Sequence, residues 1–131
     1  MNIIEVHKWS DKYYMFYTTA PNSEFFDGTE IGFAESDDGL KWEEGTLLIS
    51  PGTSGSFYDW GTMAPTVVVS TNSTSSNITS ITILFTAWQL QNTKCFPVPA
   101  DGRFGSPLSK DRCALSNIGK ATAKWPLIIE I

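Results

Sequence analysis

Residues 31–42 read Ile-Gly-Phe-Ala-Glu-Ser-Asp-Asp-Gly-Leu-Lys-Trp and join a strand pattern to a turn pattern. The first six residues form a short, largely apolar run, which is typical of a buried strand. Asp37, Asp38 and Gly39 end this run, because Asp side chains bond to nearby backbone in turns and Gly tolerates a positive φ. The stretch therefore predicts a strand that is closed by a tight turn.

Strand patterns recur along the whole chain, and no segment longer than about ten residues shows the apolar period of an amphipathic helix. Residues 13–18 are β-branched and aromatic, with turn residues on both sides. The other predicted strands cover residues 1–9, 47–49, 65–70, 81–87 and 117–123. We therefore expect a nearly all-β architecture.

Composition and charge exclude several classes of protein. The 131 residues are 41% hydrophobic and 18% charged, which fits one globular domain and argues against disorder. No apolar run approaches the roughly 20 residues of a membrane span, so we expect no membrane partner. The net charge is −5, with eleven acidic against three basic residues in 1–60 and three against six in 61–131. An acidic chain repels phosphate backbones, so we expect no nucleic-acid partner.

A weak internal repeat relates the two halves. Residues 15–18, Met-Phe-Tyr-Thr, match residues 83–86, Ile-Leu-Phe-Thr. Residues 30–36 match residues 117–123 through a shared Ile-Gly-x-Ala pattern. Two copies of one antiparallel meander explain this similarity, with a long second loop at residues 88–116.

The chain resembles the five-bladed β-propeller glycoside hydrolases, which include the family 43 arabinanases and xylosidases and the invertase and levansucrase groups. The resemblance rests on residues 12–18, on the stretch 31–42, and on Asp59 followed by residues 64–68, Ala-Pro-Thr-Val-Val. It implies an all-β, partial five-bladed propeller, with residues 1–50 as most of a first blade and 51–131 as a second. A small β-sandwich is the competing architecture and explains the repeat less well.

The blade count limits what this chain does by itself. A blade needs roughly 40–50 residues, so the chain holds about two blades of the five that close the ring. Exposed blade faces mark an interface or an aggregation liability, so the chain is either a fragment or assembles with itself.

The resemblance implies three carboxylates around a central cavity, each from a different blade. Asp59 lies just before a predicted inner strand and is the candidate catalytic residue, in the role of the carboxylate that holds the substrate. Family 43 members often have Pro after this Asp, whereas Trp60 follows here. The alternative is that Asp59 only caps a turn at the blade boundary.

Trp60 and Trp88 are candidate substrate-binding residues, because sugar rings stack on aromatic rings. The alternative, that both pack between blades, is the commoner role of large aromatics. His7 is the only histidine and has no partners at metal-ligand or triad spacing, so we expect no metal site and no cofactor.

Two cysteines and two glycosylation sequons bear on the cellular compartment in which the protein works. Cys95 and Cys113 fit either one disulfide, closing 17 intervening residues and adding roughly 3 kcal/mol, or two free thiols. Asn72 and Asn77 begin Asn-x-Ser/Thr sequons in a polar loop. The sequons are either N-glycosylation sites of a secreted protein or chance matches, which Ser/Thr-rich loops produce easily. Residues 1–9 look like a strand rather than a secretory leader, so the compartment stays open.

The sequence thus predicts a carbohydrate-binding, glycoside hydrolase-like propeller fragment that is catalytically incomplete alone. The alternative is a non-catalytic carbohydrate-binding or oligomerising interaction module. A third possibility is a truncated product with no activity of its own.

Overall fold

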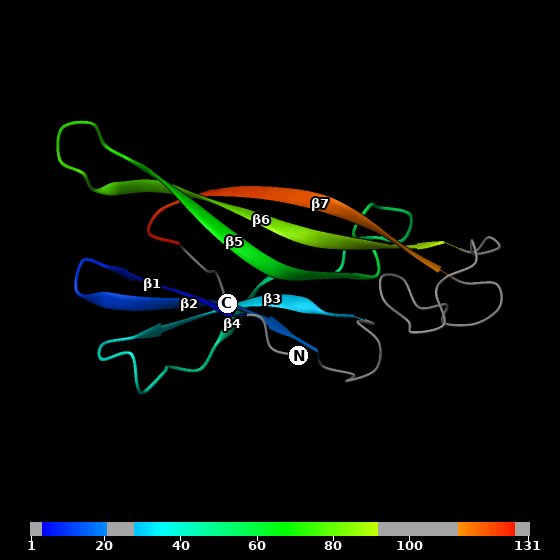
Figure 1. Cartoon of the computed structure of the whole chain (residues 1–131), viewed down its shortest axis with the longest axis horizontal. Coiled ribbons are helices and arrows are strands. Elements are labelled where there is room, and N and C mark those ends of the chain that lie inside the picture. The colour runs from blue at the N-terminus through cyan, green and yellow to red at the C-terminus, as the bar shows by residue number, and fades with distance from the viewer. Residues whose placement is uncertain (1–3, 21–27, 92–112, 128–131) are drawn as a thin grey trace.

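The computed structural model describes residues 4–20, 28–91 and 113–127, which form seven strands (Figure 1). The strands are β1 (Ile4–Trp9), β2 (Lys12–Thr19), β3 (Glu30–Ser36), β4 (Thr46–Ile49), β5 (Gly61–Thr71), β6 (Ile78–Gln91) and β7 (Cys113–Lys124). The prediction of an all-β chain is confirmed. Within these ranges no helix is long and apolar enough to cross a membrane.

The strands form two antiparallel meanders, a four-stranded sheet with the order β1-β2-β3-β4 and a three-stranded sheet with the order β5-β6-β7. The first sheet lies within residues 1–50 and the second within residues 51–131. Figure 1 shows the two sheets stacked face to face as two layers.

The internal repeat is present in the pairing of the strands. Tyr17 on β2 pairs with Gly32 on β3, and Phe85 on β6 pairs with Gly119 on β7. In both sheets the aromatic ring lies over its partner glycine, so that a Cβ atom on either glycine would overlap the ring. The absence of a glycine side chain is therefore what lets the ring lie flat on the sheet.

The main core lies between the two sheets. The first sheet contributes Phe16, Ile31 and Phe33, which are at most 5% exposed. The second sheet contributes Val67, Ile81, Ile83, Phe85 and Ala87. Alternation along β2 and β6 places these side chains on the facing sides of the two layers, so apolar burial holds the layers together.

The long second loop is shorter than the sequence predicts. The β6–β7 ladder continues from Trp88 opposite Ser116 to Gln91 opposite Cys113, so both ends of the predicted 88–116 loop belong to strands. Residues 88–91 and 113–116 mix apolar and polar side chains and carry no clear strand pattern, whereas the backbone hydrogen bonds of an antiparallel pair do not depend on side-chain type. Residues 92–112 lie outside the described part of the chain.

Candidate functional site

The segment between β4 and β5 places Asp59 two residues before the first residue of β5. Gly55 has φ of 92°, a conformation that favours glycine, and it reverses the chain ahead of Asp59. The backbone N–H of Ser56 bonds to the Thr53 carbonyl, and the N–H of Asp59 bonds to the Ser56 carbonyl. The segment is thus a compact folded loop that leads into β5.

The carboxylate of Asp59 joins this loop to the second sheet. Its Oδ2 accepts a hydrogen bond from the Gly55 N–H at 2.8 Å, and its Oδ1 accepts one from the Leu90 N–H at 2.9 Å. The Gln89 side-chain amide also donates to the Gly55 carbonyl at 3.4 Å. A carboxylate has about four lone-pair positions, so these two bonds orient the group and leave acceptor capacity for a further donor.

Trp60, which follows Asp59 in the chain, lies together with Trp88 in one cluster. Trp60 is 8% exposed and Trp88 6% exposed, and both pack with Met63. The Trp88 indole Nε1 donates to the Met63 sulfur at 2.9 Å, and the Trp60 N–H donates to the Trp88 carbonyl. Both side chains are buried in a small cluster separate from the main core between the sheets, so a substrate-binding role for Trp60 and Trp88 stays a prediction.

Two threonines connect this end of the molecule. Thr18 Oγ1 on β2 accepts a hydrogen bond from the Ala64 N–H at 2.9 Å, and Ala64 has a positive φ of 55°. Thr62 is fully buried and donates from Oγ1 to the Ile49 carbonyl at 2.8 Å. Both bonds cross between the sheets, so the start of β5 is held in place relative to the first sheet.

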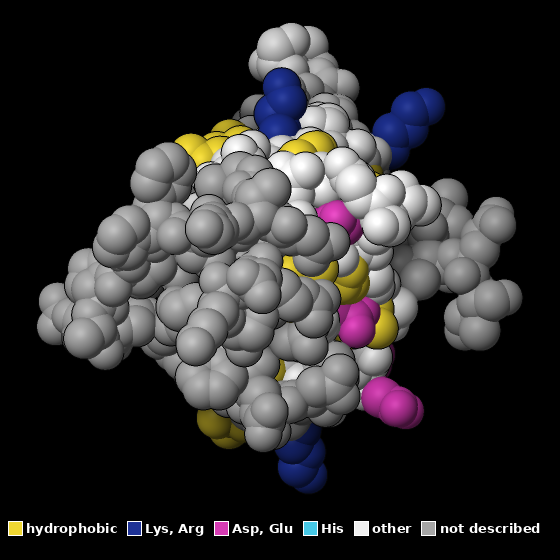
Figure 2. Space-filling view, turned by 90° about the vertical axis from the view of Figure 1, so that its right-hand side faces the viewer, with side chains coloured by type: hydrophobic (Ala, Val, Ile, Leu, Met, Phe, Trp, Pro, Cys, Tyr) yellow, Lys and Arg dark blue, Asp and Glu magenta, His cyan; other side chains and the backbone are white. Residues whose placement is uncertain are grey.

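Figure 2 looks at the end of the molecule where β6 ends. Exposed Asp and Glu side chains form a short column on this end, whereas Lys and Arg side chains lie at its margins. Glu30, the first residue of β3, accepts a hydrogen bond at Oε2 from the hydroxyl of Ser50 at 2.6 Å, so it is tied to the residue that follows β4.

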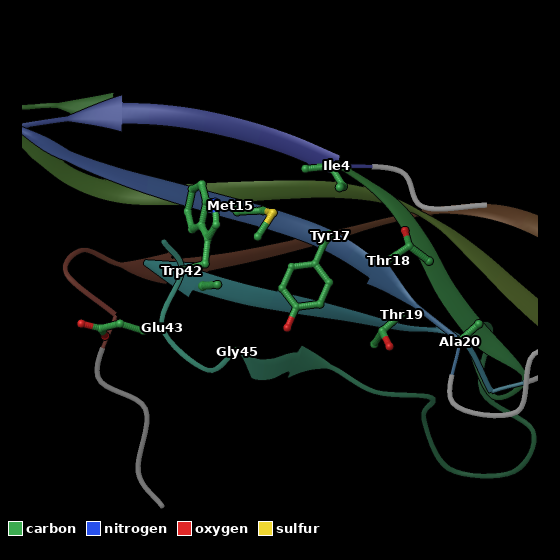
Figure 3. A pocket seen from close by; sticks show the side chains of 10 residues that line it. Ile4, Met15, Tyr17, Thr18, Thr19, Ala20, Trp42, Glu43 and Gly45 are labelled. Carbon is green, nitrogen blue, oxygen red and sulfur yellow. The ribbon is translucent and has the colours of Figure 1, made fainter. Parts of the chain in front are cut away.

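A second candidate surface is a depression of about 610 Å³ on the outer side of the first sheet. Figure 3 shows the Tyr17 side chain projecting from β2 toward Gly45, with Met15 and Trp42 beside it. Glu43 also lines the depression. The residues that line the depression come from β1, β2, β3 and the segment after β3, so no local pattern in the sequence predicts it.

The turn after β3 is stabilised by Asp38. Its Oδ1 accepts hydrogen bonds from the backbone N–H groups of Lys41 at 2.9 Å and Leu40 at 2.8 Å. These donors, Lys41 first, hold the pKa of the exposed Asp38 carboxyl below its usual value of 3.8. Asp37 and Asp38 therefore belong to a solvated turn, as the sequence predicts.

The predicted modification sites lie elsewhere. Asn72 and Asn77 are exposed in the turn between β5 and β6, and Asn72 Oδ1 accepts from the Thr74 N–H at 2.9 Å. Cys95 lies outside the described residues and Cys113 begins β7, so the disulfide stays a prediction. Among the described side chains no group of three or more His, Cys, Asp or Glu is arranged to hold a metal ion.

One residue that bridges the two sheets was not predicted from the sequence. Glu5 on β1 reaches across to the second sheet, where its Oε2 accepts the Val67 N–H at 2.8 Å. Its other oxygen lies 3.1 Å from the His7 imidazole, which stacks on Trp9. A lone acidic residue in an alternating strand gives no local signal of this role, because its partner is 62 residues away.

Comparison with known proteins supports the fold. The sequence matches no protein-family model and no curated protein. The fold is similar to the crystal structure of an N-acetylgalactosamine deacetylase from F. plautii in complex with blood group B trisaccharide. The TM-score is 0.65 at 19% sequence identity, over 93% of this chain and 32% of that one. This chain therefore spans about a third of the protein whose fold it shares.

Proposed function

We propose that the two sheets are adjacent blades of a β-propeller in a carbohydrate-active protein and that Asp59 holds a sugar hydroxyl at the mouth of the propeller. The observation that carries the proposal is the shared fold over 93% of the chain with a deacetylase that was crystallised with a trisaccharide. The resemblance of residues 31–42 to propeller glycoside hydrolases supports the same substrate class.

The geometry at Asp59 fits a substrate-holding role. Two backbone N–H groups orient its carboxylate, one from the preceding loop and one from the end of β6. Sugar hydroxyls donate hydrogen bonds, and a hydrogen bond to a charged acceptor contributes about 1.5–3 kcal/mol. Trp60 follows Asp59 in the chain and packs with Trp88 and Met63, and this cluster would form the apolar floor of the site.

The chain is proposed to be catalytically incomplete. Glycoside hydrolysis needs two carboxyl groups on either side of the scissile bond, about 5–9.5 Å apart. Asp59 is the one carboxylate that the propeller resemblance assigns to this chain. The remaining groups would come from further blades.

Binding of arabino-, xylo- and fructo-oligosaccharides and of blood group B trisaccharide, measured by calorimetry and saturation-transfer NMR, tests the proposal. We expect at least one of these sugars to bind, and we expect Asp59→Asn to weaken its affinity about tenfold or more, because a charged acceptor is lost. Asp37→Asn is the matched control, because it makes the same change at an exposed carboxylate in the turn that directly follows β3.

Circular dichroism at the binding temperature shows whether each variant is folded. Unchanged affinity in a folded Asp59→Asn variant would remove Asp59 from the site, and no binding by any of the four sugars would contradict the carbohydrate assignment. Turnover of nitrophenyl glycosides that disappears in Asp59→Asn would contradict catalytic incompleteness.

A second candidate function is an oligomerising interaction module. It is favoured by a specific observation, the apolar side chains exposed on the outer sides of both sheets.

A further inference from the structure

Exposed apolar side chains gather on the two outer sides of the molecule. Of the eight large hydrophobic residues that are most exposed in the described chain, three lie on the outer side of the first sheet and three on the outer side of the second. The first set is Ile4, Val6 and Leu47, and the second set is Val68, Leu84 and Ile118. Apolar patches of this kind mark interaction surfaces in soluble proteins.

The internal repeat defines two different sides for each sheet. We call the side on which an aromatic ring covers a glycine the glycine side, after Tyr17 over Gly32 in the first sheet and Phe85 over Gly119 in the second. The other side of each sheet is its opposite side. Phe16 occupies the opposite side of the first sheet, and Leu84 holds the matching position in the second.

The contact within the molecule joins unlike sides. Phe85, on the glycine side of the second sheet, is 6% exposed because it packs in one cluster with Phe16 and Phe33 from the opposite side of the first sheet. One glycine side and one opposite side are therefore left on the outside. By position on the strands they correspond to the two sides that pack together in the core, and the outer side of the second sheet also carries Thr82, Thr86, Lys120 and Thr122.

The outer glycine side has the form of an uncovered docking surface. Tyr17 holds the position that Phe85 holds in the core, but its ring borders the depression of about 610 Å³ rather than a second layer (Figure 3). Ile4, directly opposite Tyr17 in the β1–β2 pairing, lines the same depression and is 51% exposed.

Charge favours the same pairing. Glu43 lines the depression on the first sheet, whereas Lys120 and Lys124 are exposed on the outer side of β7. Opposite potentials on two apolar surfaces attract one another and fix their register.

We infer that the outer glycine side of one copy of this chain binds the outer opposite side of a second copy, so that copies stack head to tail and repeat the contact seen between the two sheets. Such a heterologous contact closes into a ring or grows as a chain. The inference deepens the interaction-module candidate above by naming its partner, and it needs no carbohydrate.

Sedimentation velocity of the 131-residue chain, over a range of micromolar concentrations without sugar, tests the inference. We expect species with at least twice the 14.5 kDa mass of one chain. Ile4→Asp and Ile118→Asp place the same charge on the two outer sides, and each is expected to leave the chain monomeric. Leu40→Asp is the matched control, because Leu40 is 84% exposed in a turn, and it should leave the association unchanged.

Mixing the two blocked variants separates head-to-tail contact from contact between like sides. Each variant keeps one intact outer side, so the mixture should give complexes of two chains and nothing larger. A wild-type chain that stays monomeric overturns the inference and indicates a sheet of another polypeptide as the cover. Association that survives both single variants, or a mixture that stays monomeric, also overturns it. Sugar binding is measured separately, so failure of one proposal is not read as failure of the other.

Discussion

Adding one methyl group at Gly119 should destabilise the protein more than adding it at the repeat-related Gly32. At both positions the new Cβ would overlap the ring of the cross-strand aromatic residue, Phe85 or Tyr17. Phe85 is enclosed between the two sheets, whereas Tyr17 is half-buried and borders an open depression. The same substitution thus meets a closed environment at one site and an open one at the other.

The size of the difference follows from packing. Overfilling a closed core costs about 1–3 kcal/mol, and replacing Gly by Ala recovers about 0.4–1 kcal/mol by restricting the unfolded chain. We therefore expect Gly119→Ala to lower the free energy of unfolding by about 1–2 kcal/mol and Gly32→Ala to lower it by about 0–1 kcal/mol. For a domain of this size, 1 kcal/mol corresponds to about 4 °C in Tm.

Thermal and urea unfolding, followed by tryptophan fluorescence, provide the measurement, at dilutions where the chain is monomeric. Phe85→Leu in the Gly119→Ala background should recover part of the loss, because the smaller side chain leaves room for the methyl group. Equal losses at Gly119 and Gly32, or no coupling between Gly119→Ala and Phe85→Leu, would refute the reasoning that burial of the ring sets the cost.

Two further predictions concern single hydrogen-bonding groups. Asp38→Asn should be less stable than the wild type above pH 3.8, because the N–H groups of Leu40 and Lys41 lower the pKa of the folded carboxyl and so stabilise the charged form. The difference in unfolding free energy between the two proteins should disappear as the pH falls through the lowered pKa. A difference that stays constant with pH in urea titrations would contradict this. Thr18→Val should lower the free energy of unfolding, measured in urea, by about 1–3 kcal/mol, because it removes the acceptor of the Ala64 N–H. Thr18→Ser keeps a hydroxyl and should lower it less. Equal losses in the two variants would argue against the hydrogen bond.

Local sequence was sufficient to find the strands, because alternation and turn chemistry act over a few residues. The predicted strand at 31–36 is β3 with one residue added, and the Asp-Asp-Gly turn follows it as expected. The ends of β5 and β6 extend past their apolar segments, since backbone ladders continue through polar residues such as Gln89. Strand cores were therefore predictable and strand lengths were not.

The candidate site was predictable only in part. The position of Asp59 before an inner strand followed from the resemblance, and the structure places it next to β5. Its bond to the Leu90 N–H joins residues 31 apart in sequence, and no local pattern encodes such a pair. The bridges from Thr18 and Glu5 were missed for the same reason.

The sequence by itself determined that the chain is built of strands and that its halves repeat one meander, because both properties depend on residue types at short spacing. Only the tertiary structure decided which side of each sheet faces inward. Phe16 and Tyr17 are neighbours on β2 and are both aromatic, so alternation alone marks both sides as apolar. Because the second layer covers only one side of the first sheet, Phe16 is fully buried in the core, whereas Tyr17 on the other side is half-buried.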